Sequence, residues 1–198
     1  MNPTLRGMQI AILVTDGFEQ AEFTEPKAAF EREGAITKVA SQNTGQVQGF
    51  KHDSKADRFD VDMTFKELDA KEFDAVLLPG GVMNADAIRM IPEAQTFVKD
   101  MQKQGKPIAV ICHGGWLLVS SGLVAGRTMT SWPTLQDDIR NAGGKWLDQQ
   151  VVVDGNWISS RKPDDIPAFN AKAIEVIAAY RKSSVEGTAE EAVGLASS

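Results

Sequence analysis

The stretch PIAVICHGGWLLVSS, from Pro107 to Ser121, decides the fold and contains the only cysteine of the chain. Small and β-branched apolar residues lead to Cys112. His113, two glycines and an apolar segment with helical spacing follow. This order predicts a strand that turns sharply into a helix, with Cys112 at the turn and its sulfur exposed. Such a turn is the layout of a nucleophile elbow.

Length and composition narrow the class of protein. The chain has 198 residues, of which 42% are apolar, which is enough for one sizeable domain. Acidic residues number 27 and basic residues 21, so the formal net charge is −6. Because no basic stripe is visible, we expect no nucleic-acid-binding domain and no attraction to anionic membranes.

The apolar runs are far shorter than the roughly 20 residues that span a bilayer. The first apolar run ends at an acidic residue and is typical of a strand, not of a signal peptide. One cysteine excludes an internal disulfide and fits a reducing, cytoplasmic setting. With two histidines and one cysteine, the sequence indicates neither a metal site nor a cofactor.

Strand-like and helix-like segments alternate along the chain. The predicted strands are 9–14, 35–40, 74–78, 107–111, 127–130, 151–153 and 157–159. The predicted helices are 18–33, 65–68, 85–90, 92–104, the elbow helix to about 122, 132–142 and 163 to about 181. Residues 42–63 are expected to form a hairpin or an irregular excursion. This alternation predicts a mainly parallel sheet covered by helices on both faces. We expect one domain over residues 8–182, with tails at 1–7 and 183–198.

Pro26 lies inside the predicted helix 18–33. It cannot donate a hydrogen bond to the carbonyl of Glu22, so we expect the helix to be kinked or split just after Glu22.

Polar and glycine residues follow four of the predicted strands, at 16–22, 79–81, 112–113 and 131–133. In parallel sheets, ligands collect beyond the carboxyl ends of the strands. The four stretches are therefore expected to meet at one rim of the sheet.

Cys112 has two interpretations. A cysteine is commonly a buried structural residue. At the end of a strand and the start of a helix, however, the helix field favours the thiolate, which makes a reactive thiol the preferred hypothesis.

His113 is either a locally packed side chain or a general base. Its backbone N–H has a separate use. Together with the N–H of Gly81 or Gly80, it is placed to form an oxyanion hole beside the nucleophile.

The carboxylates Glu19, Glu22 and Glu25 have i, i+3 spacing and lie along one side of a helix. One interpretation is that these carboxylates simply form a solvent-exposed side of the helix. In the other, a carboxyl next to a thiolate has a raised pKa, stays protonated and donates a hydrogen bond to the sulfur. Sequence alone does not choose between Glu19 and Glu22.

Five motifs cover about residues 8 to 180, and they are TDGFEQAEFTEP, LLPGGVMNADAIR, AVICHGGWLL, TSWPTLQDDIRNAG and VVVDGNWISSRKPDDIPAFN. Together they resemble the PfpI/ThiJ superfamily, which includes DJ-one. The resemblance is greatest to the PfpI/YhbO-like branch. It implies a flavodoxin-like three-layer α/β/α sandwich related to class I glutamine amidotransferase domains.

The resemblance also implies roles for single residues. Cys112 matches the elbow nucleophile, held in a strained backbone conformation. Glu22 matches the glutamate that hydrogen-bonds this cysteine, and Glu19 matches a second acidic position nearby. His113 matches the histidine of the protease branch. Asp86 stands where that branch has the third triad member, contributed by the neighbouring subunit.

These features predict a stress-related cysteine hydrolase. Its implied substrates are peptides, or protein or nucleotide groups modified by glyoxal or methylglyoxal. A second hypothesis is a redox-sensing or chaperone-like protein in which Cys112 is oxidised. The resemblance implies a homodimer or a higher homo-oligomer. Met83, Trp116 and Trp132 are expected to line the pocket, to contact a second subunit or to pack in the core.

Overall fold

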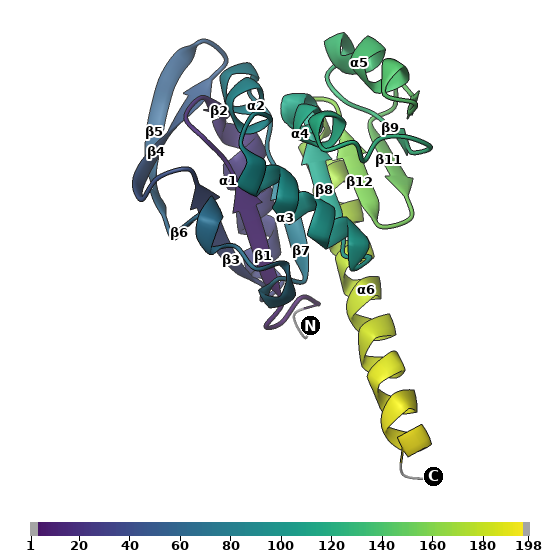
Figure 1. Cartoon of the computed structure of the whole chain (residues 1–198). Helices are drawn as coiled ribbons and strands as arrows, with labels where there is room; N and C mark the ends of the chain where they lie inside the picture. The colour runs from purple at the N-terminus through teal and green to yellow at the C-terminus, as the bar shows by residue number, and fades with distance from the viewer. Residues whose placement is uncertain (1–3, 196–198) are drawn as a thin grey trace.

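The computed structural model describes the backbone of residues 4–195 and the side chains of residues 4–181. Its centre is a seven-stranded sheet in the order β11-β12-β8-β7-β1-β3-β6 (Figure 1). The strands are β1 (Gln9–Leu13), β3 (Ile36–Ser41), β6 (Met63–Thr64), β7 (Ala75–Leu78), β8 (Ile108–Ile111), β11 (Val151–Asp154) and β12 (Trp157–Ser160). All neighbours pair in parallel except the edge strand β11, which is antiparallel to β12.

Helices cover both faces of this sheet. They are α1 (Gln20–Arg32), α2 (Val82–Ile88), α3 (Pro92–Lys103), α4 (Gly115–Ser120), α5 (Gln136–Asn141) and α6 (Ile166–Leu195). Short 3-10 turns lie at η1 (Phe65–Glu67), η2 (Ala70–Glu72), η3 (Cys112–Gly114), η4 (Pro133–Leu135) and η5 (Pro163–Asp165). The predicted three-layer α/β/α sandwich is therefore confirmed.

The alternation of side chains along the strands separates two apolar cores. In β1, Ala11 and Leu13 face the core that is closed by α2, α3 and α4. Ile10 and Ile12 face the opposite core, which is closed by α1 and α6. Because both faces are buried, the central strands are apolar throughout, as parallel strands usually are.

Two small sheets lie outside the main one. The excursion at 42–63 forms the hairpin of β4 (Gly45–Lys51) and β5 (Ser54–Val61), and β2 (Phe18–Glu19) pairs in parallel with β4. The short strands β9 (Thr128–Met129) and β10 (Lys145–Trp146) also pair in parallel. The sequence did not predict β2 or β10, because two-residue strands leave no periodic pattern to detect.

The structure corrects three expectations about the helices. Helix α1 is one continuous element that contains Pro26, so the predicted split after Glu22 is wrong. Helix α2 begins at Val82, three residues before its predicted start. Helix α6 continues to Leu195, beyond its predicted end near Arg181 (Figure 1).

The expected tails also differ from the structure. Residues 4–7 pack on the domain: Leu5 is fully buried, and its N–H donates to the carbonyl of Glu33 over 2.8 Å. Residues 183–195 belong to α6, whereas residues 1–3 and 196–198 lie outside the described part.

The elbow packs directly on the end of β7. A methyl group added to Gly114 would lie 2.5 Å from the carbonyl oxygen of Leu78 and 3.0 Å from that of Pro79. At the next residue, Gly115, it would meet only Met129 and Leu135 carbon atoms, at 3.4 and 3.6 Å. Only a glycine at position 114 therefore allows the turn to approach the strand so closely.

We predict that Gly114→Ala lowers the free energy of unfolding by about 1–3 kcal/mol, as overpacking against backbone does. Gly115→Ala is the matched control, and it should change that free energy by less than about 1 kcal/mol. Urea unfolding at neutral pH measures both variants. Equal effects of the two substitutions would contradict the proposed packing.

Candidate active site

Cys112 lies at the turn between β8 and η3, and its backbone is strained. Its φ angle is +60°, in the left-handed region that side chains other than glycine rarely adopt. The N–H of Trp132 donates to the carbonyl oxygen of Cys112 over 3.2 Å, which helps to hold the turn. The side chain is 7% exposed, so the prediction of an exposed sulfur is wrong.

Glu22 is the carboxyl that faces this cysteine. It is fully buried on α1, and its Oε2 accepts the N–H of Gly80 over 2.9 Å. Burial raises its pKa from 4.5 to about 8, although its interaction with the Cys112 side chain lowers that pKa. The other carboxyl oxygen, Glu22 Oε1, is buried and makes no hydrogen bond to any described residue, so it can carry the proton. Glu22 is therefore a neutral carboxylic acid at pH 7.

Glu19, which precedes α1, and Glu25 on α1 do not contact Cys112. Glu19 Oε2 accepts the N–H of His52 over 3.0 Å and lies 4.0 Å from His52 Nδ1. Its charge contributes to the raised pKa of Glu22. Glu25 is exposed. The structure thus brings Glu22, and not Glu19 or Glu25, next to Cys112.

Burial raises the pKa of the Cys112 thiol well above 9.0, and the neighbouring Glu22 adds to this. The backbone N–H groups of His113 and Gly81 point at the sulfur and act in the opposite direction. The sequence predicted a thiolate stabilised by the helix field. That expectation is wrong for the resting site, because the thiol is desolvated and α4 is only six residues long.

His113 lies against the sulfur. Its Nδ1 is 3.2 Å from Cys112 Sγ, although adjacent side chains on a turn usually point apart. The ring packs edge-on against Trp116 and stacks on Trp132, with centroids 5.4 and 5.9 Å away. Burial lowers the pKa of His113 from 6.5 to about 4. The imidazole is therefore neutral at pH 7 and is able to accept a proton.

No carboxylate within the described part of the chain hydrogen-bonds to the His113 ring. Asp86 is exposed on α2 and is not assembled with Cys112 in a single chain.

The two candidate oxyanion donors are not equivalent. The N–H of Gly80 is occupied by Glu22, so it is not free for a substrate oxygen. The N–H of Gly81 is directed at the sulfur, and the φ angle of Gly81 is +88°. Gly81 and the backbone of His113 are thus the donors nearest to the nucleophile.

Asn84 holds this glycine turn in place, and the sequence analysis missed it. The side chain is 1% exposed, and its amide donates to the carbonyls of Pro79 and Gly80 over 3.1 and 3.0 Å. Its Oδ1 accepts the N–H of Thr15 over 2.7 Å. An asparagine in the first turn of a helix after PGG is an ordinary surface pattern, so only the burial of its side chain reveals the role.

Among the described residues, no group of three or more His, Cys, Asp or Glu side chains is arranged to hold a metal ion. None of the described helices is long and apolar enough to cross a bilayer.

A three-layer α/β sandwich with a strained cysteine at a strand-to-helix turn, beside a buried carboxyl, defines the class of nucleophile-elbow proteins. The chain belongs to the DJ-1/PfpI family, whose model matches residues 8–176.

Individual relatives agree with this assignment. A deglycase of Thermococcus kodakarensis is 42% identical over 170 residues, which cover 86% of this chain and 99% of the relative. "Protein/nucleic acid deglycase 2" of Escherichia coli is 39% identical over 173 residues, covering 86% and 98%. The solved structure of Schizosaccharomyces pombe DJ-1 is 27% identical, with a TM-score of 0.75 and coverage of 89% and 98%.

We predict that Asn84→Ala releases the glycine turn and accelerates amide hydrogen exchange at Gly80 and Gly81, because the carbonyls of Pro79 and Gly80, which belong to the same two peptide units, lose the Asn84 amide as donor. Asn156→Ala is the matched control. Its amide donates to the Lys106 carbonyl over 2.7 Å at the amino ends of β8 and β12, the ends opposite to Cys112. Both variants should lose about 1–3 kcal/mol of stability. Unchanged exchange at Gly80 and Gly81 in Asn84→Ala would contradict the role of Asn84.

The buried Glu22 also makes stability depend on pH. Since its pKa rises from 4.5 to about 8 on folding, its stabilising contribution is full below pH 4.5 and is lost as pH rises through 8. Between pH 4.5 and pH 7, the free energy of unfolding of the wild type should fall by about 3 kcal/mol because of Glu22, at about 1.4 kcal/mol per pKa unit. The Glu22→Gln variant should not show this fall. Unfolding in urea across this range measures the difference. Glu25→Gln, the exposed neighbour, should retain the wild-type pH dependence.

Proposed function

We propose that this protein is a cysteine-dependent hydrolase in which Cys112 attacks a carbonyl carbon. The observation that carries the proposal is the 3.2 Å separation between Cys112 Sγ and Nδ1 of a neutral, buried His113. A nucleophile within hydrogen-bonding reach of a base is the arrangement that covalent catalysis requires. The relatives' names favour carbonyl adducts of protein or nucleic acid groups as substrates. Peptides are the second class.

In the proposed first step, the Cys112 thiol gives its proton to Nδ1 of His113 while the sulfur adds to the carbonyl carbon. The carbonyl oxygen becomes an oxyanion, and the N–H groups of Gly81 and His113 stabilise it. For a peptide, the tetrahedral intermediate expels the amine, which takes the proton from His113, and water hydrolyses the resulting acyl thioester.

For a dicarbonyl adduct, the amine or thiol leaves with the proton from His113 and the sulfur of Cys112 takes its place on the aldehyde-derived carbon. A proton then moves from this carbon to the neighbouring ketone carbon, which converts the intermediate into an acyl thioester without an external oxidant, and water hydrolyses it to a hydroxy acid.

Glu22 supports this step without transferring its own proton. As a neutral acid it adds no negative charge beside the sulfur, and it holds the Gly80 N–H. A carboxylate at the same place would oppose the negative charge that develops on the sulfur and the oxyanion.

We also propose that the active form is a homodimer or a higher homo-oligomer in a cytoplasmic setting. Among the side chains of residues 4–181, no carboxylate hydrogen-bonds to the His113 ring, and Asp86 of a second copy is the candidate to orient it. Sedimentation velocity tests the assembly, and a monomeric active enzyme would contradict it.

A second candidate function is oxidation of Cys112 to the sulfenic and sulfinic acids. The observation in its favour is the protonated Glu22 carboxyl next to the sulfur, which would donate to a sulfinate oxygen. Mass spectrometry after peroxide treatment tests it. Protection from oxidant by a Cys112→Ala protein would contradict both thiol-based functions.

The catalytic proposal predicts a bell-shaped pH dependence of kcat/KM. The rate should fall below about pH 4, where His113 becomes protonated, and above about pH 8, where Glu22 becomes a carboxylate. Glu22→Gln should remove the upper limb only. His113→Ala should lower the rate about 10²–10⁴-fold. The assay follows the hydrolysis of methylglyoxal adducts of N-acetylcysteine.

Cys112→Ser provides the control for thiol chemistry and should abolish turnover. Two results would overturn the proposal. One is turnover that survives Cys112→Ser. The other is alkylation of Cys112 that titrates near pH 8.5, as an unperturbed thiol does.

A further inference from the structure

A surface cleft of about 770 Å³ lies beside His113 and has no part in the steps above. One side is the first half of α1, with Gln20 and Thr24. The other side is the segment from Lys162 to Asp164, and Trp132 forms an end wall. Trp132 stacks on His113, and its N–H bonds to the Cys112 carbonyl. Trp132 therefore connects the cleft to both His113 and Cys112.

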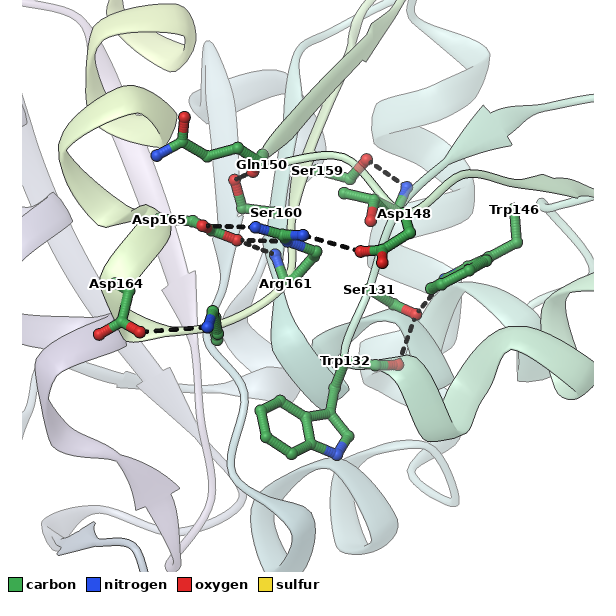
Figure 2. A network of polar contacts seen from close by, with 12 residues as sticks. Ser131, Trp132, Trp146, Asp148, Gln150, Ser159, Ser160, Arg161, Asp164 and Asp165 are labelled. Atoms are coloured by element: carbon green, nitrogen blue, oxygen red, sulfur yellow. Dashed lines mark hydrogen bonds and ion pairs between the residues drawn. The ribbon is translucent and has the colours of Figure 1, made fainter.

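The wall opposite α1 is held rigidly. The Arg161 guanidinium donates to Asp165 over 2.8 and 3.1 Å and to Asp148 over 2.7 Å (Figure 2). Asp165 is 2% exposed, so this ion pair is anchored in the domain. Lys162 and Asp164, which follow Arg161, form a further ion pair of 3.2 Å at the cleft.

The end wall is fixed in the same way. Ser131 Oγ donates to the carbonyl of Trp132 over 2.9 Å and accepts the indole N–H of Trp146 over 3.0 Å (Figure 2). The Trp132 side chain itself remains 36% exposed. The cleft is thus formed before any ligand arrives, which lowers the entropic cost of binding.

The size and charge of the cleft indicate its occupant. Cavities of about 300–1,000 Å³ enclose drug-sized ligands, so a free dicarbonyl of a few atoms would leave most of this one empty. Charges of both signs line it, with Lys51 and Lys162 near Glu25 and Asp164. A lining with both signs of charge does not favour a small anion or a small cation. It matches a polypeptide segment, which offers backbone amide dipoles and side chains of either charge.

We infer that this cleft binds an extended polypeptide segment on one side of the modified residue, so that the enzyme prefers adducts on polypeptides to adducts on free amino acids. The inference rests on the proposed function and names the substrate class of the same site.

The test fills the cleft with Thr24→Trp. Thr24 is half-buried in the wall formed by α1, and its hydroxyl bonds only to the Gln20 carbonyl. We compare kcat/KM on the methylglyoxal adduct of N-acetylcysteine with kcat/KM on the same adduct in a linear, end-blocked oligopeptide. The ratio of peptide to small substrate should fall about tenfold, equivalent to about 1.4 kcal/mol.

Thr96→Trp is the matched control. Thr96 is an exposed threonine on α3 and lines a different cavity, of about 490 Å³. The selectivity ratio should stay at the wild-type value in this variant. Lys162→Trp fills the cleft from the opposite wall and replaces Thr24→Trp if that variant does not fold. An unchanged ratio in a folded cleft-filling variant would overturn the inference, as would a change in oligomeric state, which would make the cleft a subunit contact.

A binding measurement separates this inference from the proposed function. Calorimetry with the unmodified oligopeptide and Cys112→Ser protein needs no turnover. Binding that weakens about tenfold with Thr24→Trp supports the cleft even if the wild type hydrolyses neither adduct. If the oligopeptide does not bind and the ratio of peptide to small-substrate turnover is unchanged, the cleft is not a polypeptide-binding site. The hydrolase proposal is unaffected by that result.

Discussion

The site depends on one buried carboxyl that connects three parts of the chain. Glu22 reaches from α1 to the N–H of Gly80 and to the Cys112 side chain. Each of these partners lies at the carboxyl end of a parallel strand, β7 or β8. A carboxylate buried so completely would be costly unless it were paired or protonated. The position of α1 on the sheet, the glycine turn and the protonation state are therefore coupled.

The sequence predicted the main sheet because its central strands are short, continuous apolar runs ended by turn residues. It placed Cys112, Gly81 and His113 at one rim because those residues follow adjacent strands. It did not distinguish Glu22 from Glu19, since both face the same side of a helix. That distinction depends on how α1 packs, which periodicity alone does not contain.

The expectations that failed are those that depend on long-range packing. The exposure of the Cys112 sulfur depends on how closely Gly80 and Gly114 allow the neighbouring turns to approach. The role of Asn84 depends on its burial between β1 and the glycine turn. Helix α1 continues through Pro26, whose side chain is buried, although proline cannot make the backbone hydrogen bond to the carbonyl of Glu22.

The neutral state of the resting site has a consequence for the lifetime of the thiol. Peroxides react with a thiolate and not with a protonated thiol. Because Cys112 holds its proton while His113 and Glu22 are also uncharged, the sulfur is chemically quiet between substrates. In the proposed hydrolase, a nucleophile is produced only when a carbonyl is in place to accept the sulfur. The same raised pKa slows oxidation of Cys112, so the redox-sensing alternative requires that the thiol first lose its proton.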